Sequence, residues 1–286
     1  MIRSFLFVPA DSERKLQKAA EAGADALILD LEDSVAADAR PAARARAREF
    51  LLGKKNVWVR INPIDTEDAT ADLDGVMPSA PAGIMLPKPR SAAAAIALDR
   101  RISALESKHG IELGSTRILP LCTEHPEALF TLNGYIGATP RLAGLSWGGE
   151  DLSAALGAVT NRDEHGDWLP TYEMARSLCL LAAAAAEVAA IDTVFTDFKD
   201  SEGLRRYASN ARRDGFSGML AIHPAQVDVI NAAFVPTAEE LQRAARIVAL
   251  FAANPGAGTI GMDGKMIDRP HLVQARRLLD MARDLK

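Results

Sequence analysis

Short apolar runs recur along the chain, and each is followed by a stretch with helical periodicity. Eight runs predict strands, at Ser4–Val8, Ala26–Leu31, Val57–Ile61, Gly83–Leu86, Arg117–Leu121, Leu142–Trp147, Thr193–Thr196 and Ser217–Ile222. Apolar residues spaced by three and four positions predict helices between them, for example at Ser12–Ala22, Ser91–His109 and Thr171–Ala189. The strand runs are continuous rather than alternating, which is typical of parallel strands covered on both faces. Eight strand–helix units favour a closed (β/α)₈ barrel over an open doubly wound sheet.

The length of the chain agrees with one barrel and an added segment. The sequence has 286 residues, of which 48% are hydrophobic, and barrels of this kind run to about 250 residues as a single domain. We expect a catalytic barrel over residues 1–235 and a C-terminal helical extension over residues 236–286.

The expected extension has its own pattern. Ala238–Ala252 predicts a helix, with Thr237 and Glu240 at the spacing of a capping box. A last helix is expected from about His271 to Leu285, and the segment before it, Gly261–Pro270, is too polar and bent for a barrel strand. We interpret the extension as a cover for a barrel mouth, its own or that of a neighbouring subunit.

Composition and charge exclude several classes of protein. The formal net charge is −5 and no dense Lys/Arg tract occurs, which argues against a nucleic-acid-binding surface. Met1–Pro9 lacks the features of a signal peptide, and Leu178–Ala190 is too short to span a bilayer. Cys122 and Cys179 have no metal-type spacing and are expected to be buried, reduced thiols. We therefore expect a cytoplasmic protein without a membrane or nucleic-acid partner.

Charged and polar residues follow the predicted strands at their C-terminal ends, where barrel enzymes carry their active sites. These residues are Asp30, Glu32 and Asp33 after the second run, Arg60 and Asn62 at the third, Lys88 after the fourth, Glu124 and His125 after the fifth, Glu150 and Asp151 after the sixth, and His223 after the eighth. Their consistent position predicts a site at the barrel mouth.

Glu124 and Asp151 are the candidate metal ligands. They follow neighbouring strands, and two carboxylates, with waters and substrate oxygens completing an octahedron, are a usual Mg²⁺ site. The alternative is that each acid only caps the helix that follows it. Glu150 precedes Asp151 and is expected to point elsewhere.

Arg60 is the candidate anion-binding residue. Its planar guanidinium makes paired hydrogen bonds to a carboxylate or a developing enolate. The alternative is a structural ion pair with Asp30, Glu32 or Asp33, and both roles can coexist. His223, His125 and His165 are weaker candidates, and Lys88 alone does not predict a Schiff base.

At these residues the sequence closely resembles the citrate lyase β-subunit family, within the HpcH/HpaI superfamily of metal-dependent aldolases. The matching stretches are Arg3–Pro9, Asp25–Val35, Val59–Pro63, Leu86–Lys88, Thr123–Glu124, Trp147–Leu152, His223–Gln226 and Asp263–Asp268. They span nearly the whole chain in family order, and the set is far more specific than any single stretch.

The resemblance implies a Mg²⁺-dependent lyase or aldolase acting on hydroxy-acid thioesters of coenzyme A. It places the metal carboxylates on Glu124 and Asp151 and substrate binding on Arg60 and Glu124. It also implies that Asp268 reaches a neighbouring subunit's site and handles the acetyl-CoA proton, so that Arg60 and Asp268 are the catalytic residues. Members of the family are commonly trimers, which implies a homotrimer here.

Two residues depart from the commonest family pattern near the metal ligands. His125 stands where Thr is frequent, and Gly149 stands where Ala is common. Both bear on the exact substrate more than on the reaction class. The residues that bind coenzyme A are left open, because Arg14, Lys15 and Lys18 are explained equally well as a solvated helix face.

The expected reaction is cleavage, or the reverse condensation, of a 3-hydroxy-carboxyacyl-CoA such as citramalyl-CoA or malyl-CoA, giving acetyl-CoA and a 2-oxo acid. The sequence does not separate this substrate from methylmalyl or citryl thioesters, because a methyl or carboxymethyl group changes binding by only about 1–3 kcal/mol in an apolar pocket. Three alternatives stay open: a citrate lyase β-subunit that needs an acyl-carrier partner, a class II pyruvate aldolase acting on free hydroxy-oxo acids, and a catalytically silent barrel.

Overall fold

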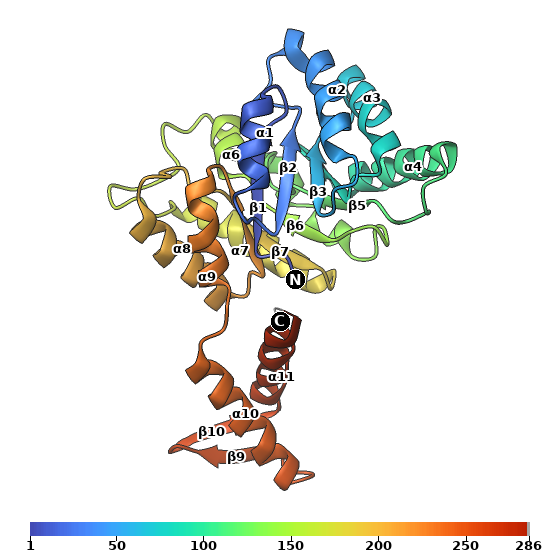
Figure 1. Ribbon diagram of the computed structural model, residues 1–286. Helices are drawn as coiled ribbons and strands as arrows, with labels where there is room; N and C mark the ends of the chain where they lie inside the picture. The colour runs from blue at the N-terminus through green and yellow to red at the C-terminus, as the bar shows by residue number, and fades with distance from the viewer. Residues whose placement is uncertain (285–286) are drawn as a thin grey trace. The chain divides into compact units, whose positions relative to one another are not determined.

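Parallel strands form the central sheet of the protein, which is described here as a computed structural model (Figure 1). The strands are β1 (Ser4–Pro9), β2 (Ala26–Asp30), β3 (Val57–Arg60), β4 (Gly83–Leu86), β5 (Arg117–Pro120), β6 (Gly144–Ser146), β7 (Ala189–Asp192) and β8 (Gly218–Ala221). The hydrogen-bonded order is β5-β4-β3-β2-β1-β8-β7-β6. Parallel bridges from Ile118 to Leu142 and from Leu121 to Ser146 join the two edges. The predicted (β/α)₈ barrel is confirmed.

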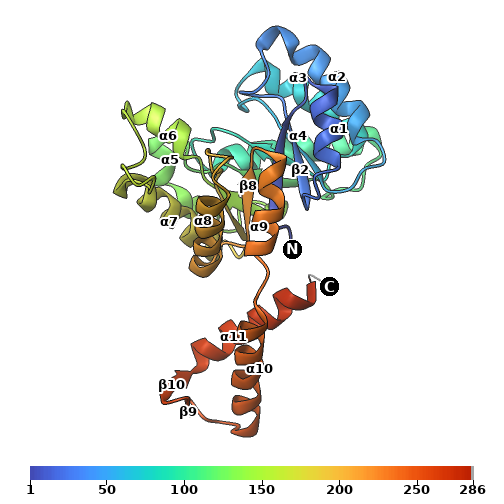
Figure 2. The same cartoon turned by 60° about the vertical axis from the view of Figure 1, so that its left-hand side comes forward.

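Helices surround these strands in Figure 1, and Figure 2 shows α8 and α9 beside β8. The helices of this part are α1 (Glu13–Ala20), α2 (Arg40–Leu51), α3 (Glu67–Val76), α4 (Ala92–His109), α5 (Pro126–Leu129), α6 (Gly149–Leu156), α7 (Pro170–Ala185), α8 (Ser201–Asp214) and α9 (Val227–Ala233). The structure describes residues 1–284, and within that range no helix is long and apolar enough to cross a membrane.

Large apolar side chains fill the barrel. Phe5, Ile28, Trp58 and Leu220 belong to one buried cluster with residues from other strands. Phe5 and Trp58 meet edge to face, with ring centroids 5.6 Å apart. A Cβ on Gly83 would lie 2.2 Å from the Trp58 ring, so glycine is required where this indole fills the interior. Because side chains alternate along a strand, the residues two positions beyond Ile28 and Trp58 also face inward, at the mouth.

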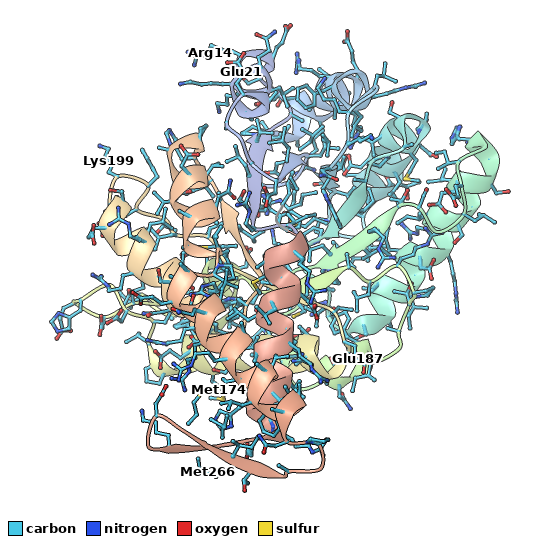
Figure 3. The ribbon with its side chains drawn as sticks, turned by 60° about the horizontal axis from the view of Figure 1, so that its bottom comes forward. Arg14, Glu21, Met174, Glu187, Lys199 and Met266 are labelled. Carbon is cyan, nitrogen blue, oxygen red and sulfur yellow. The ribbon has the colours of Figure 1, made fainter. Side chains whose placement is uncertain are left out.

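The seventh strand was predicted wrongly. It lies at Ala189–Asp192 and not at Thr193–Thr196, because α7 ends four residues earlier than its alanine-rich pattern indicates. Glu187, which is labelled in Figure 3, adopts a left-handed φ of 56°. The N–H of Val188 then donates to the carbonyl of Ala183, which ends the helix. Glycine usually marks this kind of stop, and here a glutamate stands in its place.

The chain divides into two compact units, one of Ile2–Asn231 and another that comprises Met1 and the chain from Ala232 onward. The second unit contains α10 (Ala238–Ala253), β9 (Thr259–Met262), β10 (Lys265–Asp268) and α11 (Arg269–Asp284). As predicted, Thr237 and Glu240 form a capping box at the start of α10. The expected end of the last helix at Leu285 lies outside the described residues.

Strands β9 and β10 form an antiparallel hairpin that was not predicted. Asp263 and Gly264 at its turn have φ values of 53° and 73°, and Asp-Gly with two positive φ angles is a favoured hairpin turn. Ile267 of the hairpin packs with Phe251 of α10 and Leu272 of α11 in a separate core. Asp268 is therefore held at the end of a strand that is tied into its own small core.

Candidate active site

Arg60 and Asp30 form the base of the candidate site. They are register partners on the neighbouring strands β3 and β2. The guanidinium donates from Nε and Nη2 to the two carboxylate oxygens of Asp30, at 2.7 Å each. Burial alone raises the pKa of Asp30, but the hydrogen bonds from Arg60 outweigh this and leave the pKa lowered. The predicted ion-pair alternative is thus present, and Asp30 fixes the plane of the guanidinium.

Glu32 lies between two cations. One of its oxygens is 3.0 Å from Nη1 of Arg60, and the other accepts a hydrogen bond of 2.7 Å from Nζ of Lys88. The residue is 2% exposed. Burial raises the pKa of Glu32 to about 7, even though Arg60 and Lys88 both act to lower it. Glu32 therefore links the two positive side chains of the mouth.

Glu124 follows β5 and is buried, with an exposed fraction of 3%. Its Oε2 accepts a hydrogen bond of 2.5 Å from the backbone N–H of Lys88. A Cβ on Gly148 would lie 2.7 Å from its Cγ, so the glycine leaves room for this carboxylate. Burial and then the charge of Asp151 raise the pKa of Glu124 well above its usual value. A buried carboxylate of this kind needs a cation or a proton.

Asp151 lies in the first turn of α6, and its side chain is 36% exposed. One oxygen lies 3.4 Å from Nζ of Lys88. Lys88 links the two acids, because its backbone N–H donates to Glu124 while its Nζ lies beside Asp151. Glu150 is exposed, and its charge acts to raise the pKa of Arg162. The structure thus brings together the two acids that the sequence selected, with Lys88 beside both.

This pair of acids fits Mg²⁺ better than a metal that takes all of its ligands from protein side chains. Within residues 1–284, no group of three or more His, Cys, Asp or Glu side chains is arranged to hold a metal. Magnesium usually takes only one or two carboxylates and completes its shell with water and substrate oxygens.

The three histidine candidates have different neighbours in the structure. His223 stacks on Phe198, with ring centroids 4.7 Å apart, and its Nδ1 accepts the N–H of Ala225. His125 precedes α5 and lines a cavity of about 360 Å³ that also includes Lys88. His165 is exposed and lies 3.9 Å from Glu164.

The close packing of Gly149 against Trp168 was not predicted from the sequence. A Cβ at this position would lie 2.7 Å from the Trp168 ring. Trp168 packs edge-on against Trp147, whose Nε1 donates to buried Asp192 at 2.7 Å. The methyl group that is common in the family pattern is thus replaced by an indole from the loop before α7, and Gly149 marks that contact.

In the C-terminal unit, Asp268 has an imidazole partner that was also not predicted. Oδ1 of Asp268 lies 2.5 Å from Nδ1 of His271, and the backbone N–H of Asp268 also points at this nitrogen. The ring therefore holds one oxygen of the carboxyl in place. The spacing of three residues at the start of α11 is the signal that could have indicated the pair.

A larger cavity opens beside the ends of β1 and β8. Its volume is about 690 Å³, and Arg14, Lys15 and Lys18 of α1 line it together with one acid, Glu21, and with His223 and Pro224. The side chain of Arg14 is labelled in Figure 3. Three basic groups on one wall suit a ligand that carries phosphates.

Comparisons with known proteins agree with this geometry. The family model described as HpcH/HpaI aldolase/citrate lyase matches residues 3–224. A (3S)-malyl-CoA thioesterase of Cereibacter sphaeroides is 37% identical over 98% of this chain and 94% of its own. The citrate lyase subunit beta of Haemophilus influenzae is 34% identical over 98% of this chain and 97% of its own.

A solved structure extends the likeness to the fold. The CitE protein of Mycobacterium tuberculosis, in complex with magnesium, acetoacetate and coenzyme A, matches with a TM-score of 0.84 and 34% sequence identity. The match covers 98% of each chain. The predicted enzyme class, a Mg²⁺-dependent oxo-acid lyase, and the predicted metal are confirmed by these relatives.

Proposed function

The chain belongs to the HpcH/HpaI aldolase/citrate lyase family, and we propose that it cleaves a 3-hydroxy-carboxyacyl-CoA of the citramalyl or malyl type to acetyl-CoA and a 2-oxo acid. The reverse condensation would use the same groups. One observation carries the proposal: buried Glu124 and neighbouring Asp151 stand at the same barrel mouth as the clamped guanidinium of Arg60.

Glu124 and Asp151 would hold the metal. When bound there, Mg²⁺ would supply a Lewis acid for the oxygens of the 2-oxo acid. Lys88 keeps Glu124 in place through its backbone N–H, so the carboxylate does not have to reorganise. Fixed ligands of this kind are what an electrostatic mechanism needs.

Arg60 would stabilise negative charge on the thioester oxygen as the carbon–carbon bond breaks. Asp30 occupies two of its donors, and Glu32 lies next to the third nitrogen. The charge is permanent and its direction is set before substrate arrives, which is the condition for transition-state stabilisation without reorganisation. The ring of Phe7, 4.8 Å from the guanidinium carbon, covers one side.

Asp268 would protonate the enolate carbon of acetyl-CoA, or remove that proton in condensation. The contact with His271 supports this role, because the ring holds one oxygen of the carboxyl in place for proton transfer at the other. We propose that Asp268 serves a neighbouring subunit within a homotrimer. Subunits carrying Asp268→Asn, mixed with subunits carrying Glu124→Gln, should then regain part of the activity that each variant lacks alone.

The cavity beside α1 would receive the phosphates of coenzyme A. Arg14, Lys15 and Lys18 supply its positive charge, and the cavity reaches the residues that follow β8. The relative solved with bound coenzyme A supports a thioester substrate. An anionic ligand is compatible with a chain of net charge −5 because these three groups are placed on one wall.

Hydrolysis of malyl-CoA is the second candidate, because a relative with 37% identity is named a malyl-CoA thioesterase. The two reactions differ in their products. Lyase activity releases acetyl-CoA and a 2-oxo acid, whereas hydrolysis releases free coenzyme A and the hydroxy acid. A need for an acyl-carrier partner, as in a citrate lyase subunit, would appear as inactivity of the purified chain on coenzyme A thioesters.

The deciding experiment is a panel of malyl-, methylmalyl-, citramalyl- and citryl-CoA, assayed with and without Mg²⁺. The proposal predicts Mg²⁺-dependent release of a 2-oxo acid from the malyl or citramalyl thioester by the purified protein. Free hydroxy-oxo acids are the control for a class II pyruvate aldolase. Release of 2-oxo acid only from those free acids, or full turnover in excess chelator, would contradict the proposal. We also propose that the enzyme acts in the cytoplasm.

A further inference from the structure

Lys88 has an unusual backbone conformation at the centre of the site. Its φ is 50°, a left-handed value that non-glycine residues rarely adopt. In this conformation the N–H points at Oε2 of Glu124, at 2.5 Å. The backbone of Lys88 therefore supports one of the two proposed metal ligands before its side chain is considered.

The side chain of Lys88 reaches three other carboxylates. Its Nζ lies 2.7 Å from Glu32, 2.9 Å from Asp33 and 3.4 Å from Asp151. The side chain is only 22% exposed. Burial lowers the pKa of Lys88, but the hydrogen bonds that its ammonium donates to Glu32 and Asp33 outweigh this effect and leave the pKa raised. The ammonium is thus a fixed positive charge among acids from different loops.

The other charged groups at the barrel mouth define the role of this ammonium. Arg60 makes two hydrogen bonds to Asp30 and a contact with Glu32, and it makes no ion pair with Asp151. Among residues 1–284, the ion pair of Asp151 is with Lys88. A divalent cation bound by Glu124 and Asp151 would lie close to the ammonium of Lys88, because that ammonium pairs with Asp151. The two cations would repel each other at this short range.

We propose that Lys88 sets the magnesium affinity of the site. Its ammonium is the counter-ion of Asp151 in the metal-free protein, gives up that contact when Mg²⁺ binds, and stays on Glu32 and Asp33. Metal binding then includes the loss of one ion pair and the approach of two positive charges, so the affinity is held below what the acids alone would give. The inference rests on the metal site of the proposed function.

The test is calorimetric titration of Mg²⁺ into chelator-stripped protein. Lys88→Met removes the charge, and Lys88→Gly removes it while suiting the left-handed backbone and keeping the N–H on Glu124. Both should bind Mg²⁺ about tenfold more tightly than the unchanged protein, which corresponds to about 1.4 kcal/mol. Lys88→Arg keeps the charge and should stay within about threefold. Lys108→Met, on an exposed lysine at the end of α4, controls for general loss of charge.

Unchanged or weaker Mg²⁺ binding in Lys88→Met and Lys88→Gly would overturn the role of Lys88 and leave the metal site standing. Absence of Mg²⁺ binding to the unchanged protein would overturn the metal site itself, so the two failures are distinguishable. Thermal unfolding gives a second readout. Both variants should melt lower than the unchanged protein without metal and gain more from Mg²⁺, and equal gains would also count against the proposal.

Discussion

Gly148→Ala tests the placement of Glu124 by a single methyl group. The new Cβ would lie 2.7 Å from Cγ of Glu124 and 3.1 Å from its Oε1. Gly148 has a φ of −123°, which alanine adopts without strain, so the effect is steric. Glu124 has little freedom to yield, because it is 3% exposed and its other oxygen is held by the N–H of Lys88.

The size of the effect follows from overpacking. Forcing a methyl group into a filled site typically costs about 1–3 kcal/mol of folding free energy. Because the displaced group is a proposed metal ligand, Mg²⁺ affinity should fall by about 10- to 100-fold, as when a residue that orients a ligand is lost. Urea unfolding measures the first quantity, and calorimetric Mg²⁺ titration measures the second.

Gly134→Ala is the matched control. Its Cβ would meet only the Cβ of Ala92, at 3.4 Å, so stability should change by no more than about 0.5 kcal/mol. If Gly148→Ala keeps both normal stability and normal Mg²⁺ affinity, Glu124 does not stand against the β6–α6 loop, and the reasoning is refuted.

Three further predictions concern Arg60, Asp268 and Glu32. Arg60→Lys cannot keep the paired hydrogen bonds to Asp30, so kcat/KM should fall about 100-fold while Mg²⁺ affinity stays the same; a fall below threefold in steady-state assays would count against the role of the guanidinium. Asp268→Asn should abolish turnover and leave Mg²⁺ binding within about twofold, and near-normal turnover would remove Asp268 from the mechanism. The pKa of Glu32 is about 7 in the folded protein against 4.5 unfolded, so the folded state binds more protons between these values. The metal-free protein should therefore lose up to about 3 kcal/mol of stability as pH rises from 4.5 to 7, and Glu32→Gln should remove this part of the slope in denaturation curves.

The barrel was largely predictable from the sequence because its signals are local. Continuous apolar runs mark strands that are covered on both faces, and seven of the expected runs overlap the observed strands. The remaining strand, β7, was missed because Glu187, rather than glycine, ends α7 in a left-handed conformation. The hairpin of β9 and β10 was missed because each strand has only four residues with polar residues among them, although Asp263-Gly264 is a hairpin signal.

The site was predictable where strand ends determine it. Arg60 and Asp30 meet because β2 and β3 are adjacent and in register, and the strand-end rule placed Glu124 and Asp151 in one mouth. The central position of Lys88 was not predictable, because it depends on a φ value that its residue type disfavours and on the reach of a long side chain. The contact of Trp168 with Gly149 joins a loop to the metal-ligand segment across the fold, and no local pattern reports it.

The most direct measurement is a crystal structure of the protein with Mg²⁺ and a 2-oxo acid such as pyruvate. The account predicts one ion bound by an oxygen of Glu124 and an oxygen of Asp151, each at about 2.0–2.1 Å, with the acid completing the shell. A well-ordered 2-oxo acid bound without an ion between these two carboxylates, or an ion bound elsewhere in the mouth, would contradict it.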